Sequence, residues 1–242
     1  LTPIQMITGI AAAVNGGNTA INGELTANIV VNENVLTAEG KLNGDGSDFR
    51  VWIPIGNENN SYSGSFNGQN HTVSGVYLND SNAHTGGFFG YVSGGSVKNA
   101  GVVDSYFNVS SRVGGVVGYI YGTVENCYNE GTVNGKFYVG GVVGENNGIV
   151  ENCHNKGAVR SSVYVGGIVG ENNRTVINCY NTGTIGGNFS VAGGVVGENY
   201  GTVTSCYSAG TVSGGGTISN VGGVAGIIQE NSTVTNCYYD NT

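Results

Sequence analysis

The chain has few charged residues and almost no proline, and these absences exclude several classes of protein. Charged residues make up 10% of its 242 residues, against roughly 25% in an average soluble protein. Disordered chains are rich in charge and poor in β-branched and aromatic residues, which does not describe this sequence. It holds only two prolines and shows no strict every-third-residue glycine, so a collagen helix is excluded too.

Basic residues and long apolar runs are also scarce. Only eight Lys and Arg are present, scattered singly, and the net charge is −8, so no basic face for nucleic acid can form. No apolar run is long enough to insert into a membrane. Residues 4–14 are apolar but follow no positive charge, which argues against a signal peptide. We expect a mature protein, or a fragment whose export signal has been removed.

Glycine, asparagine and β-branched residues dominate what remains. The chain contains 45 glycines and 14 tyrosines, and valine, isoleucine and threonine occur throughout. Gly, Asn, Val and Thr are weak helix formers. The composition therefore predicts an all-β protein with frequent glycine turns.

Two markers repeat in phase along the sequence. The pattern Gly-Gly-x-x-Gly begins at Gly86, Gly114, Gly140, Gly166, Gly193 and Gly222. A cysteine follows the middle four of these glycines at one constant interval and follows Gly222 at a slightly longer one, and Ala100 takes the same place in the first copy. A fixed period of this length is typical of a repeat architecture.

Each period contains three β-branched segments separated by turn residues, as in residues 139–144, 148–154 and 157–159. Three strands in about 26 residues predict one coil of a right-handed parallel β-helix, or β-solenoid, with about six coils in all. A propeller blade needs roughly 40–45 residues. A leucine-rich horseshoe is excluded because leucine is almost absent after Leu78.

Strand alternation assigns the interior. If residues 148–154 formed one regular strand, Glu151 and Cys153 would face the same side, so we expect a bend near Asn152. The predicted inward residues are Val124, Val150, Val176, Val203 and Val234. The predicted corner residues are Asn126, Asn152, Asn178, Ser205 and Asn236.

The N-terminal part of the chain, residues 1–85, is irregular. Thr2 and Pro3, followed by apolar residues at helical spacing, predict a capped helix that ends near residues 15–17. Short strands are expected at residues 24–31, 51–55 and 72–77. We therefore divide one continuous domain into an N-terminal cap with irregular first coils, residues 1–85, and regular repeats, residues 86–242. No cap is visible after the last cysteine, which predicts that the chain was cut from a longer one or that a partner covers this end.

The repeat resembles the GLUG motif of bacterial surface proteins, in which Gly-Gly-x-x-Gly precedes Gly-Thr-Val-x-Asn-Cys-Tyr and a further Gly-Thr-Val. The resemblance covers residues 86–242, and residues 52–56 and 64–75 look like the segment that precedes such repeats. It implies an exported or wall-associated protein, often an adhesin-like module. Similar repeats also occur beside the protease domain of metallopeptidases that cleave immunoglobulin A. The resemblance carries over no catalytic residue.

The cysteines form the first candidate column: Cys127, Cys153, Cys179, Cys206 and Cys237. Neighbouring coils would bring them within disulfide range, but five is an odd number and stacked positions point their sulfurs in parallel. Ala100 takes the same place in the first repeat, which indicates that this position requires a small apolar side chain. We predict a buried column of free thiols, and neither a zinc site nor any other cofactor.

The residue after each cysteine gives the second column: Tyr128, His154, Tyr180, Tyr207 and Tyr238. Such a stripe can dock sugar rings or an apolar patch of a partner, which would make it a ligand-contact column. The alternative, which we favour, is a structural ladder of stacked rings.

The third column is acidic. Glu145, Glu171 and Glu198 lie in phase behind Tyr91 and Tyr119. Like charges one coil apart repel each other, so we expect a solvated edge. Calcium bound between neighbouring glutamate and asparagine groups is the alternative, although the repeat lacks the aspartates of calcium-binding β-rolls.

Enzymatic chemistry is not expected. Hydrolysis of glycosides needs paired carboxylates, and the five aspartates form no cluster with His and Arg; they are Asp45, Asp48, Asp80, Asp104 and Asp240. His71 and His84 are isolated, and no His-Glu-x-x-His occurs. An active site breaks a repeat once, and no such break is visible.

Three hypotheses remain for the function. The first is a non-catalytic extracellular structural or adhesion module that presents a rigid repetitive face to a host or matrix ligand. The second is a glycan-binding module that uses the tyrosine column. The third is an accessory β-helix domain of a secreted protease or polysaccharide-active enzyme. The partner is not identified by the sequence; a host glycoprotein or glycan is the expected class, on the cell wall or outside the cell.

Overall fold

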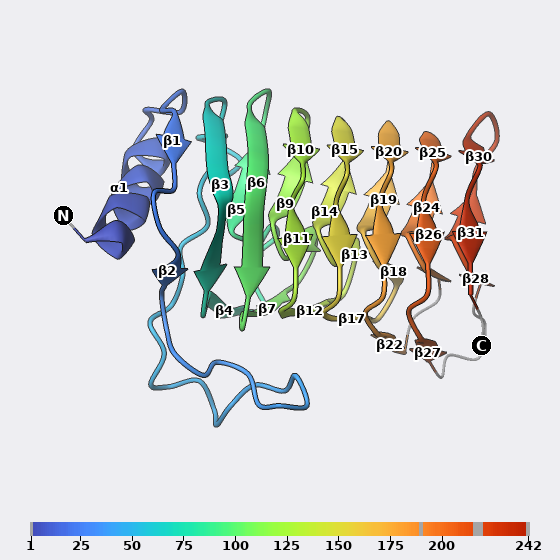
Figure 1. The fold of residues 1–242 in the computed structure, drawn as a ribbon, viewed down its shortest axis with the longest axis horizontal. Coiled ribbons are helices and arrows are strands. Elements are labelled where there is room, and N and C mark those ends of the chain that lie inside the picture. The colour runs from blue at the N-terminus through green and yellow to red at the C-terminus, as the bar shows by residue number, and fades with distance from the viewer. Residues whose placement is uncertain (1, 189–190, 215–219, 241–242) are drawn as a thin grey trace.

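The computed structural model describes residues 2–188, 191–214 and 220–240, and it shows a parallel β-solenoid with one helix at its N-terminal end (Figure 1). All paired strands run parallel, and each coil lies beside the next along the long axis. An all-β solenoid of about six regular coils is therefore confirmed. The right-handed sense of the coil stays a prediction.

The strands fall into four sheets. The largest holds β1 Gly23–Glu24, β2 Ile29–Val30, β3 Ser65–Ser74, β6 Ser96–Val103, β10 Thr123–Glu125, β11 Tyr128–Asn129, β15 Ile149–Glu151, β16 His154–Asn155, β20 Thr175–Ile177, β21 Tyr180–Asn181, β25 Thr202–Thr204, β26 Tyr207–Ser208, β30 Thr233–Thr235 and β31 Tyr238–Tyr239. The second holds β4 Tyr77–Asp80, β7 Tyr106–Val109, β12 Thr132–Gly135, β17 Ala158–Ser161, β22 Ile185–Gly187 and β27 Val212–Gly214. The third holds β8 Val113–Gly114, β13 Val139–Gly140, β18 Tyr164–Gly166, β23 Val191–Gly193 and β28 Asn220–Gly222. The fourth holds β5 Phe89–Val92, β9 Val117–Ile120, β14 Val143–Asn146, β19 Val169–Asn172, β24 Val196–Asn199 and β29 Ala225–Ile228.

The expectation of three strands per coil is wrong, because a regular coil such as β13–β17 holds five short ones. The predicted segment 139–144 is divided between β13 and β14, where a Cβ on Gly140 would overlap the carbonyl of Val143. The segment 148–154 is divided between β15 and β16. These sharp corners let each short coil close around its own core.

The predicted corner is confirmed. Asn126, Asn152, Asn178, Ser205 and Asn236 all have positive φ, between 53° and 55°. Left-handed backbone is costly for most L-residues, and asparagine tolerates it best after glycine. The corner turns the chain between the two halves of the largest sheet. Of the five predicted inward valines, all but Val234 are fully buried, and Val234 of the last described coil is partly buried.

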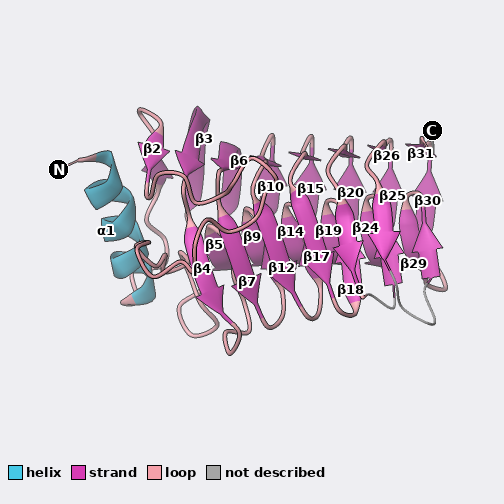
Figure 2. Cartoon of the chain, turned by 90° about the horizontal axis from the view of Figure 1, so that it is seen from below, coloured by secondary structure: helices cyan, strands magenta, loops and turns pink. Residues whose placement is uncertain are grey.

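The predicted N-terminal helix is confirmed as α1, Pro3–Asn15. The Thr2 hydroxyl accepts the backbone N–H of Gln5, whose side-chain oxygen accepts the backbone N–H of Thr2 in return. The helix lies across the N-terminal end of the solenoid (Figure 2). It buries Ile7, Ala11 and Val14 against the core.

The irregular strands differ from expectation. Residues 51–55 form no strand; Val51 and Ile55 make single bridges to Tyr77 and Phe89. Residues 24–31 form only β1 and β2. Residues 72–77 belong to two strands separated at Gly75, whose φ is 75° and where a Cβ would overlap the carbonyl of Asn32.

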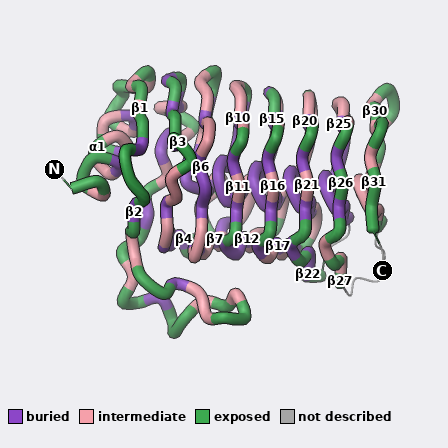
Figure 3. Tube along the Cα trace, viewed as in Figure 1, coloured by how far each residue is buried: buried purple, intermediate pink, exposed green. Residues whose placement is uncertain are grey.

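Burial follows the coils. Figure 3 shows buried segments recurring at the same place in successive coils. Large aromatic side chains fill the N-terminal end of the core, including Phe66, Phe88 and Phe89, whereas valine and isoleucine fill the regular coils. Parallel pairing already begins within residues 1–85, where β1 and β2 pair with β3, and β3 in turn pairs with β6. The division into residues 1–85 and 86–242 stays a prediction.

Candidate functional site

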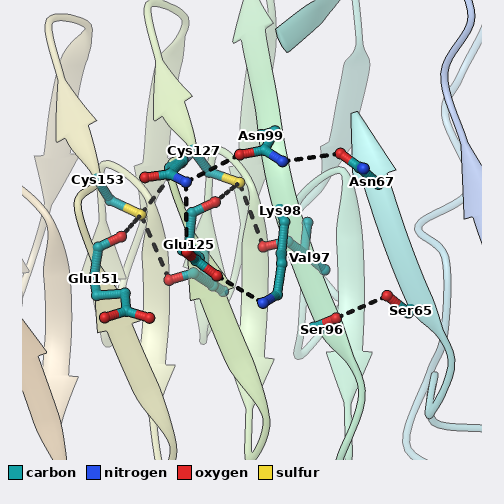
Figure 4. Close-up of polar contacts among 12 residues, drawn as sticks. Ser65, Asn67, Ser96, Val97, Lys98, Asn99, Glu125, Cys127, Glu151 and Cys153 are labelled. Atoms are coloured by element: carbon teal, nitrogen blue, oxygen red, sulfur yellow. Dashed lines mark hydrogen bonds and ion pairs between the residues drawn. The ribbon is translucent and has the colours of Figure 1, made fainter. Parts of the chain in front are cut away.

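The cysteines stack inside the corner of the largest sheet. Cys127, Cys153, Cys179 and Cys206 are buried, Cys237 is partly exposed, and all five are free thiols. The backbone N–H of Cys127 donates to Cys153 Sγ at 3.4 Å, and the same bond joins each cysteine to the next. Each sulfur also donates to the carbonyl two residues earlier, as from Cys127 to Glu125 (Figure 4). At the left-handed corner the cysteine N–H has no backbone acceptor in the strand ladder. The sulfur of the next cysteine accepts it instead.

Burial makes the thiols of Cys127 and Cys179 poor nucleophiles. It raises the pKa of Cys127 to about 12 and raises that of Cys179 well above its usual value. The pKa of Cys206 is raised by its hydrogen bond with Cys179 and by burial. Since the thiolate is the reactive and metal-binding form, these raised pKa values disfavour nucleophilic chemistry and metal binding, and the structural role of the column stays a prediction.

The aromatic column is a continuous ring stack. The ring centroids of Tyr128 and His154 lie 4.8 Å apart, those of His154 and Tyr180 4.7 Å apart, and those of Tyr180 and Tyr207 5.1 Å apart. The interplanar angles are 8°, 1° and 4°. Tyr238 pairs with Tyr207 in the strand register and is 72% exposed.

The stack covers the ring faces and leaves the edges outside. Tyr128 packs over Gly101, where a Cβ would overlap the tyrosine ring, and the rings that follow cover one another. Sugar rings bind to the face of an aromatic side chain, and here the faces are already occupied from Tyr128 to Tyr180. Burial, and next the charge of Lys156, lowers the pKa of His154, so the imidazole is neutral near pH 7 and serves as a flat ring.

The acidic column differs from the solvated edge that the sequence predicts, and that expectation is wrong. Glu145 and Glu198 are only 8% and 5% exposed, and Glu171 between them is partly buried. Arg112 Nε donates to Glu145 at 2.6 Å, Asn173 Nδ2 donates to Glu171 at 3.0 Å, and Gln229 Nε2 donates to Glu198 at 2.6 Å. The side chains that cover these carboxylates come from turns outside the strand.

Two asparagine ladders were not among the candidates from the sequence. Asn129, Asn155 and Asn181 form one, with amide bonds of 2.9 Å between coils. The other consists of Asn146, Asn172 and Asn199, with bonds of 2.7 Å. All six are buried. Their signal was visible as in-phase asparagines in three successive periods. Their oxygens accept backbone N–H groups at the turns, as Asn129 does from Gly131.

Two of the aspartates and His71 have partners outside these columns. Asp104 accepts the backbone N–H groups of Val35 and Leu36, and Asp45 accepts that of Ser47. His71 Nδ1 lies 3.2 Å from the side-chain oxygen of Asn28. Over residues 2–188, 191–214 and 220–240, no group of three or more His, Cys, Asp or Glu is placed to hold a metal ion. In the same ranges no helix is both long and apolar enough to cross a membrane.

With the columns and the coil geometry established, sequence comparison identifies the repeat. The model of the GLUG motif matches residues 109–134 and 135–160. The chain contains GLUG motifs. In the structure these two matches are consecutive coils, each running from the end of one strand of the second sheet to the same place in the next.

Two proteins are similar to this chain. Halomucin of Haloquadratum walsbyi (strain DSM 16790 / HBSQ001) is 33% identical over 123 residues, which is 49% of this chain but only 1% of halomucin. The crystal structure of a "putative immunoglobulin A1 protease" from Bacteroides ovatus superimposes with a TM-score of 0.77 at 20% identity, covering 97% of this chain and 74% of that one. The second likeness shows a shared fold.

Proposed function

We propose that this chain is a non-catalytic structural or adhesion module of an extracellular or wall-associated protein. The observation that carries the proposal is the ring stack together with the cysteine ladder: the repeated side chains are used to join coil to coil. Such a solenoid is a stiff rod whose surface repeats at each coil. The GLUG motifs and the likeness to halomucin support this role.

The face that it presents is the outer side of β10, β15, β20, β25 and β30. Ile149 is 43% exposed on it, and Thr202 and Thr233 bond across neighbouring coils at 3.2 Å. Thr204 and Thr235 do the same at 3.1 Å. Together with Glu125 and Glu151 on the same side of β10 and β15, these side chains form a surface of hydroxyl, aliphatic and carboxylate groups with a repeat of one strand spacing, roughly 4.8 Å. We propose that a host or matrix ligand binds along this face.

An adhesion assay tests this proposal. Beads that carry the chain should bind immobilised host matrix proteins or glycoproteins, and Ile149→Arg should abolish that binding while the melting temperature is unchanged. Thr182→Arg is the matched control, because Thr182 is exposed in a turn between β21 and β22. Equal loss of binding in both variants, or no binding by the unmodified chain, would overturn the proposed face.

The glycan-binding and enzyme-accessory alternatives give different results in two further assays. A glycan array that responds to the intact chain and is silent for Tyr207→Ser would favour glycan binding through the ring column. Incubation of the chain with immunoglobulin A1 should leave the antibody intact. Cleaved heavy chain would contradict a non-catalytic role.

A further inference from the structure

The acidic column places three carboxyl groups in one line. Glu145, Glu171 and Glu198 are paired in register on β14, β19 and β24. Adjacent strands lie roughly 4.8 Å apart, so each carboxyl group is close to the next. Burial of two of them and partial burial of the third strengthen the mutual repulsion.

Each outer carboxyl group has a carboxyl neighbour on one side only, because Glu145 also pairs with Tyr119 and Glu198 also pairs with Ile227. Glu145 is bonded to Arg112, whose guanidinium also lies over the Tyr119 ring and 3.8 Å from Glu58. Glu198 accepts from the Tyr200 hydroxyl at 2.9 Å and from Gln229 at 2.6 Å. Arg112 therefore places a cation at one end of the line, whereas Glu198 at the other end has neutral donors.

The central carboxyl group has only neutral partners in the described part of the chain. Glu171 accepts the Asn173 amide, and the Tyr138 hydroxyl, whose ring stacks on Tyr164, also bonds to it. No ion pair reaches it from the described residues on the packed strands. Burial raises the pKa of Glu171, and the charges of Glu145 and Glu198 add to the effect.

We propose that Glu171 is the proton-binding site of this solenoid, and that the coils become more tightly joined when it takes up a proton on mild acidification. The protonated carboxyl group keeps its bonds to Asn173 and Tyr138 and ends the repulsion on both sides. Because the folded chain binds this proton more tightly than the unfolded chain, the added stability is complete below the unfolded pKa. It is lost as the pH rises through the folded pKa. This inference does not depend on the proposed function.

Glu171→Gln tests the proposal, since the amide has the shape of the protonated acid and no charge. At pH 7.5 we expect the variant to melt about 2–4 °C above the parent, and the difference should disappear near pH 4. Glu230→Gln is the matched control, because Glu230 is exposed in a turn and its replacement removes the same charge. If both variants show the same shift at every pH, the proposal is wrong.

A direct measurement on the unmodified chain does not depend on how the variant folds. Carbon-13 NMR of labelled glutamate carboxyl groups should show one resonance, absent in Glu171→Gln, that titrates above the exposed glutamates. A normal midpoint for that resonance overturns the proposal. Calcium chloride at pH 7.5 provides the second arm: if calcium raises the melting temperature of the parent but not of Glu171→Gln, the column binds a cation and not a proton.

Discussion

The imidazole of His154 lies parallel to the ring of Tyr180, with an angle of 1° and 4.7 Å between the ring centroids. That spacing equals the distance between strands of neighbouring coils, so the backbone ladder and the ring stack have the same repeat. A histidine in a column of tyrosines is accommodated because a neutral imidazole is also flat. The relationship indicates that planarity, and not the phenol hydroxyl, is what the column requires.

Replacing Tyr180 with serine should therefore reduce stability. The change removes ring contacts with His154 and Tyr207, each worth about 0.5–1.5 kcal/mol beyond the buried area. A loss of about 1–3 kcal/mol lowers the melting temperature by roughly 2–4 °C per kcal/mol. Thermal denaturation followed by circular dichroism measures it.

Tyr238→Ser is the control for that variant, because Tyr238 lies at the last described coil and is 72% exposed. Its effect should be clearly smaller. Equal destabilisation by the two substitutions would show that stacking inside the column is not the cause.

The stability of the folded chain should depend on pH through His154. Its pKa is lowered by burial and by Lys156, so the folded chain binds this proton less tightly than the unfolded chain. Stability from this group is present above about pH 6.5, the unfolded value, and is lost as the pH falls toward the folded pKa. His154→Tyr keeps the stack and removes the titrating imidazole, so the melting temperature of the variant should exceed that of the parent by more at pH 5 than at pH 7.5. A parallel pH profile in both proteins would contradict a neutral, stacked imidazole.

Much of this architecture could be predicted from single residues. The glycine and cysteine spacing indicated the coil length, and Glu151 beside Cys153 required a corner at Asn152, where the structure has φ of 54°. The predicted number of strands per coil was wrong because strand periodicity does not show the sharp local turn between Gly140 and Val143, which divides one predicted segment into two strands. The prediction that the acidic column is a solvated edge was wrong for a similar reason. Arg112 and Tyr138 approach it from separate turns, and strand periodicity contains no information about what covers a side chain.

The cysteine ladder predicts a graded reactivity. In the native chain Cys237 should react first with Ellman's reagent, because it is partly exposed, whereas the other four are buried. All five thiols should react once the chain is unfolded without reductant. Two or fewer reactive thiols in the unfolded chain would indicate disulfides between coils.

Deleting one sulfur tests its role at the corner. Cys153→Ala leaves the buried N–H of Cys127 without the acceptor that it has at 3.4 Å, and an unsatisfied buried donor costs about 1–3 kcal/mol. Cys153→Ser keeps an acceptor and a donor in the same place and should be destabilised less. Urea denaturation compares them. A serine variant no more stable than the alanine variant would assign the effect to lost packing.

The corner itself can be tested at Asn152, whose φ is 54° and whose side-chain oxygen accepts the Asn178 amide at 3.3 Å. Alanine at this position must adopt left-handed backbone at a cost of about 1–2 kcal/mol. Glycine adopts the same backbone without a Cβ penalty and loses only conformational entropy, about 0.5–1 kcal/mol. We therefore expect Asn152→Ala to be less stable than Asn152→Gly, and Asn152→Val to be the least stable because its β-branch crowds the turn. Urea denaturation of the three variants gives the order. If alanine and glycine are equivalent, the corner depends on the asparagine side-chain bond and not on its backbone conformation, and Ser205 at the equivalent corner should then resist replacement by glycine as strongly as Asn152 does.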